Sequence, residues 1–243
     1  MHVLNSEAVN LLVKKLGAQI EPPNSSLELR IGKLVHDSRQ TIPGSAFFCI
    51  SGERTDGNEY ISDAIKSGAV CIVTEKKNPT CTIPQILVAD IRQALAAFAD
   101  ALYDRPSTKL RLIGVTGTNG KTTTTHLIEC ILNRSGFRCG MIGTLGSRTP
   151  DQKEMHEAKH TTPQAPELQE MLAKMEESKC SHVAMEVSSH SLALKRVAGC
   201  NFAVAVLSNI TQDHLDFHKT MDHYWHSKRI LFESLNDSEQ DNK

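Results

Sequence analysis

The stretch that decides the fold is KLRLIGVTGTNGKTTTT, which runs from Lys109 to Thr125. Its first half is apolar, as expected of a strand buried in a parallel sheet. Two glycines in the turn that follows let backbone N–H groups face one point, where a polyphosphate can bind at the start of the next helix. Lys121 supplies a charge for the terminal phosphates, and the Thr122 hydroxyl can complete a magnesium shell. The stretch therefore predicts a nucleoside triphosphate site that comprises Gly117, Thr118, Asn119, Gly120, Lys121, Thr122 and Thr123.

The site is a variant of the common P-loop, which has a glycine five places before Gly120, where this chain has Val115. A glycine-rich strand-to-helix turn can also be nothing more than a tight turn. The Gly-Lys-Thr triplet between an apolar strand and a helix favours the nucleotide site. The helix is expected to end at Gly136, and its apolar residues recur on one face at Leu127, Ile128, Ile131 and Leu132.

Composition narrows the classes of partner. The 243 residues are 40% hydrophobic, and 27 basic against 28 acidic residues give a formal charge of -1. With so small a net charge, the protein's electrostatic field would not draw it to nucleic acid or to an anionic membrane, so we expect small-molecule partners. We expect a monomer, although neither charge nor motif bears on the oligomeric state. The seven cysteines show no close pairing, which is typical of reduced thiols in a cytoplasmic protein. We find no secretion signal and no apolar run long enough to span a membrane.

The first part of the chain is expected to form a small α/β domain over residues 1–89. It starts with an amphipathic helix that ends at Gly17, and a polar connector follows. Turn signals then separate short β-rich runs at residues 34–35, 46–50, 70–74 and 86–89, with one helix over residues 61–68.

The second part, residues 90–243, is expected to be a P-loop-type domain with a mostly parallel sheet. A helix over residues 91–103 leads into the phosphate-loop strand, and a strand over 138–143 precedes a long polar loop over 147–162. A helix that starts at Pro166, strands over 182–187 and 202–207, and a helix over 221–235 complete the pattern. Alternating strands and helices predict ligands at the carboxyl ends of the strands.

Polar residues at two of these strand ends are the next candidates. The strand over 182–187 brings Glu186 to its carboxyl end, where a buried carboxylate needs a partner. A nucleotide-bound magnesium ion is one such partner, and a nearby Arg or Lys is the alternative. The next strand ends in SNITQDHLDFH, in which His214 lies closest to the strand. Zinc is disfavoured because there is no HExxH motif and no cysteine partner. Lys228, from its pattern alone, is an ordinary solvated helix lysine.

Taken together, these motifs resemble the Mur ligases of peptidoglycan precursor synthesis. The resemblance rests on HDSR (36–39), PGSAFFCISGERTDG (43–57), GTNGKTT (117–123), HTTPQAPELQ (160–169), EVSSHSLALKRV (186–197) and NITQDHLDFH (209–218). GTNGKTT alone would admit the whole superfamily, including folylpolyglutamate synthetases. The DSR, TTP and EVSSH segments narrow the match to the ligases that add the third amino acid of the precursor peptide.

The resemblance implies a role for each matching residue. In the first domain, Ser38, Glu53, Arg54 and Thr55 would contact the uridine diphosphate end of the substrate; in the second, Thr161, Thr162, Ser188 and Arg196 would hold its muramoyl-dipeptide part. Thr122, Glu186, His214 and a carbamylated Lys228 would serve magnesium, and Lys121, Lys228 and His214 would be catalytic. Two positions depart from the family pattern: Leu194 replaces an expected glutamine, and His160 replaces a common asparagine.

The implied reaction joins meso-diaminopimelate or lysine to UDP-MurNAc-L-Ala-D-Glu at the expense of ATP, through an acyl phosphate. Family members carry a third, C-terminal domain that binds the incoming amino acid, and we expect this chain to lack it and therefore to be inactive by itself. We also expect its second domain to be incomplete. Two alternatives remain at this point. One is a remnant that binds nucleotide or precursor as a scaffold without catalysis. The other is a folylpolyglutamate-synthetase-like ligase.

Overall fold

The structure is a computed structural model that describes residues 2–23, 29–52, 55–152, 155 and 160–237. Contacts divide it into two units, Met1–Tyr103 and Asp104–Lys243. Each unit contains a five-stranded, mostly parallel sheet, so the expected α/β fold is confirmed.

The division between the units differs from the expected boundary at residues 89 and 90. Helix α3 (Ile91–Leu102) packs on the first unit rather than leading into the second, because most of its apolar face is buried there. Phe98 of α3 meets Phe48 edge to face, with ring centroids 5.7 Å apart. This contact ties α3 to the first sheet.

The first unit has the strand order β1-β5-β4-β3-β2, in which only β1 runs antiparallel to its neighbour. Strand β1 falls within the segment expected to be a polar connector, where three residues with one apolar side chain give no strand pattern. Before α3 the unit comprises α1 (Ser6–Lys15), β1 (Gln19–Glu21), β2 (Lys33–Val35), η2 (Ser38–Gln40), β3 (Ser45–Phe48), η3 (Gly57–Tyr60), α2 (Ile61–Lys66), β4 (Ala69–Thr74) and β5 (Gln85–Leu87).

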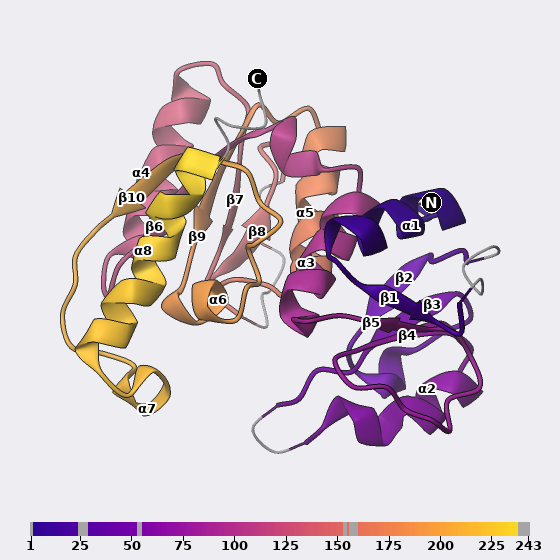
Figure 1. Cartoon of the computed structure of the whole chain (residues 1–243). Helices are drawn as coiled ribbons and strands as arrows, with labels where there is room; N and C mark the ends of the chain where they lie inside the picture. The colour runs from indigo at the N-terminus through magenta and orange to yellow at the C-terminus, as the bar shows by residue number, and fades with distance from the viewer. Residues whose placement is uncertain (1, 24–28, 53–54, 153–154, 156–159, 238–243) are drawn as a thin grey trace. The chain divides into compact units, whose positions relative to one another are not determined.

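The second unit has the strand order β10-β6-β9-β7-β8 (Figure 1). Strand β8 is antiparallel to β7 and forms a hairpin with it, and the other strands are parallel. The unit comprises η4 (Pro106–Thr108), β6 (Arg111–Thr116), α4 (Lys121–Arg134), β7 (Cys139–Gly143), β8 (Gly146–Arg148), α5 (Ala165–Glu177), β9 (His182–Glu186), α6 (Ser189–Ala193), β10 (Phe202–Leu207), α7 (Leu215–His218) and α8 (Met221–Asp237).

Parallel pairing brings three strand ends to one edge of this sheet. Val115 of β6 pairs with Glu186 of β9, and Thr116 of β6 pairs with Leu207 of β10. The segments that follow β6, β9 and β10 therefore start side by side, which is the arrangement that gathers ligand-binding residues in α/β proteins.

The helices cover the two faces of this sheet. The connection from β6 to β7 and the connection from β7 back to β9 cross the sheet in opposite directions, so right-handed crossovers place α4 and α5 on opposite faces. One core cluster joins α5 and α8 to the strands and includes Leu172, Phe202 and Leu231.

Helix α4 departs from the sequence expectation in the face that it buries. Its buried residues are Thr125 and Glu129, whereas Leu127 and Ile131 are 57% and 60% exposed. Two of the four residues of the apolar face read from the sequence are therefore exposed, whereas Ile128 and Leu132 are half-buried.

The expected loop over residues 147–162 also needs correction, because it begins inside β8. Antiparallel pairing with β7 makes Ser147 and Arg148 part of a strand that is too short to show a pattern of its own. No helix among the described residues is both long and apolar enough to cross a membrane.

Two leucine substitutions test which helix faces are buried. Leu172→Ala on α5 removes a fully buried side chain, so we expect it to lower the free energy of unfolding by about 2–5 kcal/mol. Leu127→Ala on α4 removes an exposed one and should change it by less than about 0.5 kcal/mol. Urea denaturation of both variants measures the difference; equal losses would contradict the orientation of α4.

Candidate functional site

A cavity of about 260 Å³ lies where the carboxyl ends of the parallel strands of the second unit meet. It brings together residues that the sequence predicted from four separate motifs. Its lining comprises Gly117, Thr118, Asn119, Gly120, Lys121, Thr122, Thr144, Thr161, Glu186, Ser188, Ser189, His214 and Lys228. Thr123, the remaining residue of the predicted nucleotide motif, is exposed on α4 and is not part of this lining.

The phosphate loop joins β6 to α4, and Gly117 allows its tight contact with the next strand. The backbone of Gly117 has a φ of +146°, and a Cβ there would lie 1.9 Å from Ser208 Oγ. Only glycine is compatible with both conditions. Gly120 occupies the left-handed region immediately before Lys121, the first residue of α4.

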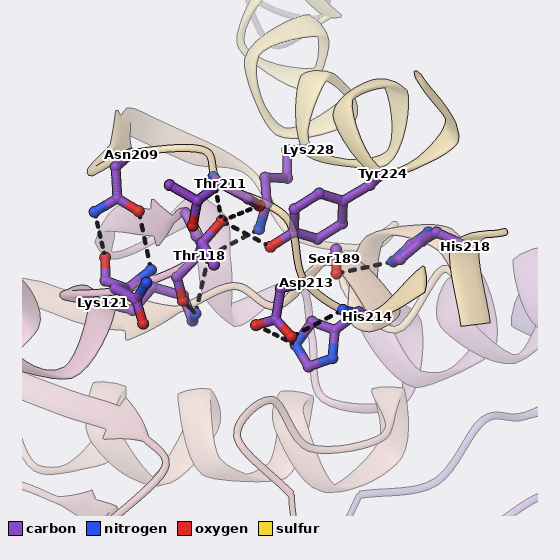
Figure 2. A network of polar contacts seen from close by, with 12 residues as sticks. Thr118, Lys121, Ser189, Asn209, Thr211, Asp213, His214, His218, Tyr224 and Lys228 are labelled. Atoms are coloured by element: carbon purple, nitrogen blue, oxygen red, sulfur yellow. Dashed lines mark hydrogen bonds and ion pairs between the residues drawn. The ribbon is translucent and has the colours of Figure 1, made fainter. Parts of the chain in front are cut away.

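The segment that follows β10 holds this loop through several hydrogen bonds (Figure 2). Thr118 N–H donates to the Asn209 carbonyl at 3.0 Å, and Asn119 N–H donates to Asn209 Oδ1 at 3.1 Å. The Thr118 hydroxyl lies 3.1 Å from both the Thr211 carbonyl and the Tyr224 hydroxyl. Two of the loop N–H groups that were expected to face a phosphate therefore bond to Asn209 instead. Fewer loop amides are left for a phosphate than the sequence predicted.

Lys121 lies folded over the loop. Its Nζ donates to the carbonyls of Gly117 and Thr118, each at 2.9 Å. Burial lowers the pKa of Lys121, and the nearby carboxylates of Glu186 and Asp213 oppose that shift. The cation is therefore held at the loop by carbonyl acceptors and kept within the field of two acids.

Glu186 ends β9 and is 1% exposed. Its carboxylate accepts three hydrogen bonds, from Thr122 Oγ1 at 3.0 Å, from Thr144 N–H at 2.9 Å and from Thr144 Oγ1 at 3.1 Å. A Cβ on Gly143 would lie 2.3 Å from Glu186 Oε1, so glycine is required for this close approach. The ion pairs of the described residues do not include Glu186, which leaves hydroxyl and amide donors as the partners of this buried carboxylate.

The donors around Glu186 fit a hard divalent cation. A threonine hydroxyl and a carboxylate are the oxygen ligands that magnesium accepts, together with phosphate oxygens and water. Among the described residues, no group of three or more His, Cys, Asp or Glu side chains could hold a metal ion by itself. The chemistry of the site therefore suits a magnesium ion whose ligands come partly from the protein and partly from a nucleotide.

His214 lines the same cavity at the start of α7, with a φ of +53°. Its backbone N–H donates to Asp213 Oδ1 at 2.8 Å, and its imidazole ring lies edge-on to the rings of His190 and Tyr224. The structure brings His214 to the site, as predicted, through a loop conformation that the sequence pattern does not reveal.

Lys228 is buried, which corrects the expectation of a solvated helix lysine. It is 1% exposed, its Nζ donates to the Gly117 carbonyl at 2.8 Å, and the Nζ lies 4.4 Å from the centroid of the Tyr224 ring. Burial, with a smaller effect of the nearby Lys121 cation, lowers the pKa of Lys228 to about 8. The amine is therefore far more readily deprotonated than that of a surface lysine.

His218 connects the short helix α6 to α8. Its Nε2 lies 2.9 Å from Ser189 Oγ and its Nδ1 3.3 Å from Ser227 Oγ (Figure 2 shows the first contact). Burial lowers the pKa of His218 to about 4, helped by the neighbouring His190 and His214. A neutral imidazole that spans two serines fixes the position of Ser189 in the cavity wall.

The residues predicted to hold the peptide part of the substrate divide into two groups. Thr161 and Ser188 line the cavity. Thr162 is buried and donates to the Glu186 carbonyl at 2.9 Å, and Arg196 donates to the Thr162 carbonyl at 3.1 Å. Neither of these two belongs to the cavity lining, so in this structure they support the strand end behind it.

The first unit has a separate cavity of about 460 Å³. It includes Ser38 and Thr55, two of the four residues predicted to contact uridine diphosphate; Glu53 and Arg54 lie outside the described residues. The lining comprises His36, Asp37, Ser38, Arg39, Phe47, Ile50, Thr55, Gly57 and Tyr60. Arg39 pairs with Asp37 at 2.7 Å and lowers the pKa of that carboxyl group.

Sequence reasoning missed Thr144 and Tyr224. Thr144 directly follows β7, and the same rule that selected Glu186 at the end of its strand could have selected it. The sequence does place Ser189 at this sheet edge, together with Ser188, and both line the cavity. Tyr224 had no signal, because its hydroxyl reaches Thr118 only through the packing of α8.

Comparisons with known proteins agree with this arrangement. A family model described as the Mur ligase middle domain matches residues 115–240, and one described as the catalytic domain of the Mur ligase family matches residues 30–103. The UDP-N-acetylmuramoyl-L-alanyl-D-glutamate--2,6-diaminopimelate ligase of Bacillus licheniformis is 42% identical over 93% of the chain. The ligase of the same name from Gloeobacter violaceus is 49% identical over 84% of the chain.

Solved structures show the same fold. One diaminopimelate ligase of that name superposes with a TM-score of 0.71 at 26% identity, over 87% of this chain and 46% of its own. A MurF structure from Acinetobacter baumannii gives a TM-score of 0.63 at 20% identity, over 97% of this chain and 47% of its own, which is a likeness of fold alone. The chain spans less than half the length of the relatives that it matches: 44% of the Bacillus ligase and 42% of the Gloeobacter ligase.

Proposed function

The chain belongs to the Mur ligase family, and from that premise we propose that it binds the ATP and the precursor for a ligase that adds a diamino acid to UDP-MurNAc-L-Ala-D-Glu. The observation that carries the proposal is the single cavity in which Lys121, Thr122 and Glu186 converge. The names of the relatives favour 2,6-diaminopimelate over lysine as the amine. They also favour this proposal over a folylpolyglutamate-synthetase-like ligase.

The phosphates of ATP would bind at the start of α4. The first N–H groups of a helix have no intrahelical partner, and in α4 they follow Gly120 at the edge of the cavity. Thr118 and Asn119 use their amides to hold the loop against Asn209 instead. Lys121, which now donates to two loop carbonyls, would turn to the terminal phosphates when they arrive.

Thr122 and Glu186 would hold the magnesium ion that accompanies the nucleotide, with His214 and Lys228 further round the same cavity. When bound, this ion neutralises charge on the phosphates during transfer. The 3.0 Å contact between the Thr122 hydroxyl and the Glu186 carboxylate supports this assignment, because it places two oxygen donors together at the mouth of the phosphate loop.

The chemical step would activate the substrate carboxylate. Its oxygen attacks the γ-phosphorus, ADP leaves, and the product is an acyl phosphate. The amine of the diamino acid then attacks the acyl carbon, loses a proton, and releases phosphate. Phosphoryl transfer depends mostly on positioning and charge neutralisation, which Lys121 and the α4 amides are placed to supply.

The remaining cavity wall would receive the substrate. Thr161 and Ser188 offer hydroxyl groups to the peptide part beside the phosphate loop. In the first unit, Ser38 and Thr55 line a cavity that suits the uridine diphosphate end. A carbamylated Lys228 would add a carboxylate to the nucleotide cavity, and its lowered pKa supports that modification because only the neutral amine reacts with carbon dioxide.

Replacement of Lys121 tests the nucleotide site. Lys121→Ala removes a cation that would donate to phosphate, so we expect its affinity for ATP with magnesium to fall by roughly 10- to 100-fold, the range for a lost charged hydrogen bond. Calorimetric titration of the 243-residue chain with ATP measures this effect.

Two controls accompany this titration. Lys174→Ala removes an exposed lysine of α5 that pairs with Glu170 on the same helix, and this variant should bind ATP like the wild type. UDP-MurNAc-dipeptide should bind both variants equally. Unchanged ATP affinity in Lys121→Ala would contradict the assigned site, and a wild-type chain that binds the dipeptide precursor but no ATP would favour the precursor-binding scaffold.

Carbamylation of Lys228 can be observed directly. With a pKa of about 8, roughly a quarter of the amine is neutral at pH 7.5, compared with about one part in a thousand for an ordinary lysine. We expect a carbamate carbonyl signal in carbon-13 NMR after addition of labelled bicarbonate, weakening as the pH falls below 7. Lys228→Arg should abolish that signal and Lys174→Arg should retain it. A wild-type spectrum without the signal would contradict the assignment.

A further inference from the structure

We propose that the ion pair between Glu129 and Arg148 positions the Glu186 carboxylate, acting through the β7–β8 hairpin and its Thr144. The inference rests on the proposed function of Glu186 in the magnesium–ATP site. Neither Glu129 nor Arg148 belongs to the cavity lining, so both are positioning residues and neither is catalytic.

The pair is well defined and largely removed from solvent. Arg148 Nε donates to Glu129 Oε1 at 3.0 Å, and Arg148 Nη2 donates to Glu129 Oε2 at 2.7 Å. The side chains are 9% exposed for Glu129 and 26% exposed for Arg148. Two parallel bonds between planar groups fix orientation as well as distance.

The location of the pair is unexpected for a stabilising contact. On α4 the acid Glu129 faces the protein while Leu127 and Ile131 face solvent. A well-packed apolar pair could stabilise such an interface equally well or better. A charged pair adds a directional restraint that apolar side chains would not provide.

That restraint reaches the nucleotide cavity along the hairpin. Arg148 of β8 pairs with Met141 of β7, and the tight turn between the strands carries Thr144. Thr144 holds both oxygens of Glu186, through its N–H and its hydroxyl. The position of the hairpin therefore contributes to where the carboxylate points.

Helix α4 also contacts the Glu186 carboxylate directly. Thr122, about two helical turns before Glu129 on the same helix, donates to the same carboxylate. Helix α4 is thus linked to the β7–β8 hairpin at two places. At its first turn, Thr122 and Thr144 bind the same Glu186 carboxylate, and further along, Glu129 pairs directly with Arg148. Loss of the second contact would remove one restraint on the hairpin that carries Thr144, whose hydroxyl also contacts Thr161 at 3.1 Å, and would loosen the orientation of the Glu186 carboxylate toward the phosphate loop.

Four variants test the proposal. Glu129→Gln and Arg148→Gln each break the charged pair, and Arg148→Lys keeps the charge without the two-bond geometry. The matched control is Glu170→Gln, which breaks an exposed glutamate–lysine pair on α5.

The first measurement is amide hydrogen exchange at Thr144 in the nucleotide-free chain, because that N–H donates to Glu186. We expect exchange at Thr144 to accelerate about 10-fold in the two Gln variants, less in Arg148→Lys, and not in Glu170→Gln. The second measurement is the ratio of ATP affinities with magnesium and with a chelator. Loss of a group that orients a metal ligand costs about 10- to 100-fold in metal affinity, so the ratio should fall by about 10-fold in the Gln variants.

Each result decides the matter. Unchanged exchange at Thr144 would overturn the proposal whether or not the chain binds ATP. Faster exchange with an unchanged magnesium ratio would also overturn it, since the pair would then be structural only. If the Gln variants fail to fold, the same two measurements on Arg148→Lys decide. A wild-type chain that does not bind ATP would refute the proposed function, and with it this role of the pair, even where Thr144 exchange responds to the variants.

Discussion

A buried carboxylate at the end of a strand is the constraint on which the site depends. Glu186 has to be satisfied where water does not reach it, and the structure does this with donors from two other elements, Thr122 of α4 and Thr144 of the β7–β8 turn. The same requirement explains Gly143, whose missing side chain leaves room for the carboxylate. One buried acid therefore fixes the start of the helix and the end of the hairpin relative to the sheet.

The parallel sheet makes this convergence possible. Because β6, β9 and β10 end at one edge, the phosphate loop, Glu186 and the Asn209 segment start side by side. Asn209 then holds the loop from one side, and Lys228 from α8 reaches the Gly117 carbonyl. Burial lowers the pKa of both Lys121 and Lys228, and a polyphosphate is an anionic ligand that would stabilise their charged forms.

Much of this arrangement could be predicted from the sequence. Apolar runs and turn residues located nearly every long strand and helix, and the strand-end rule selected Glu186 and His214. Strands β1 and β8 were not predicted, although β2 and β5 are equally short, because their sequences QIE and GSR contain too few apolar residues to show a pattern and both pair antiparallel to a neighbour. The burial of Glu129 and Lys228 could not be predicted for a different reason, since only tertiary packing decides which face of a helix is covered. The resemblance to the Mur ligases, rather than any periodicity, pointed to Lys228.

The central claim is that Lys121, Thr122 and Glu186 form one magnesium–nucleotide site. A crystal structure of the chain with manganese and a non-hydrolysable ATP analogue tests it most directly, because the anomalous signal locates the ion independently of the protein. The account predicts a single manganese peak between the Thr122 hydroxyl and the Glu186 carboxylate, with the terminal phosphate against Lys121. A nucleotide bound away from the phosphate loop, or an ion that does not contact Glu186, would contradict it.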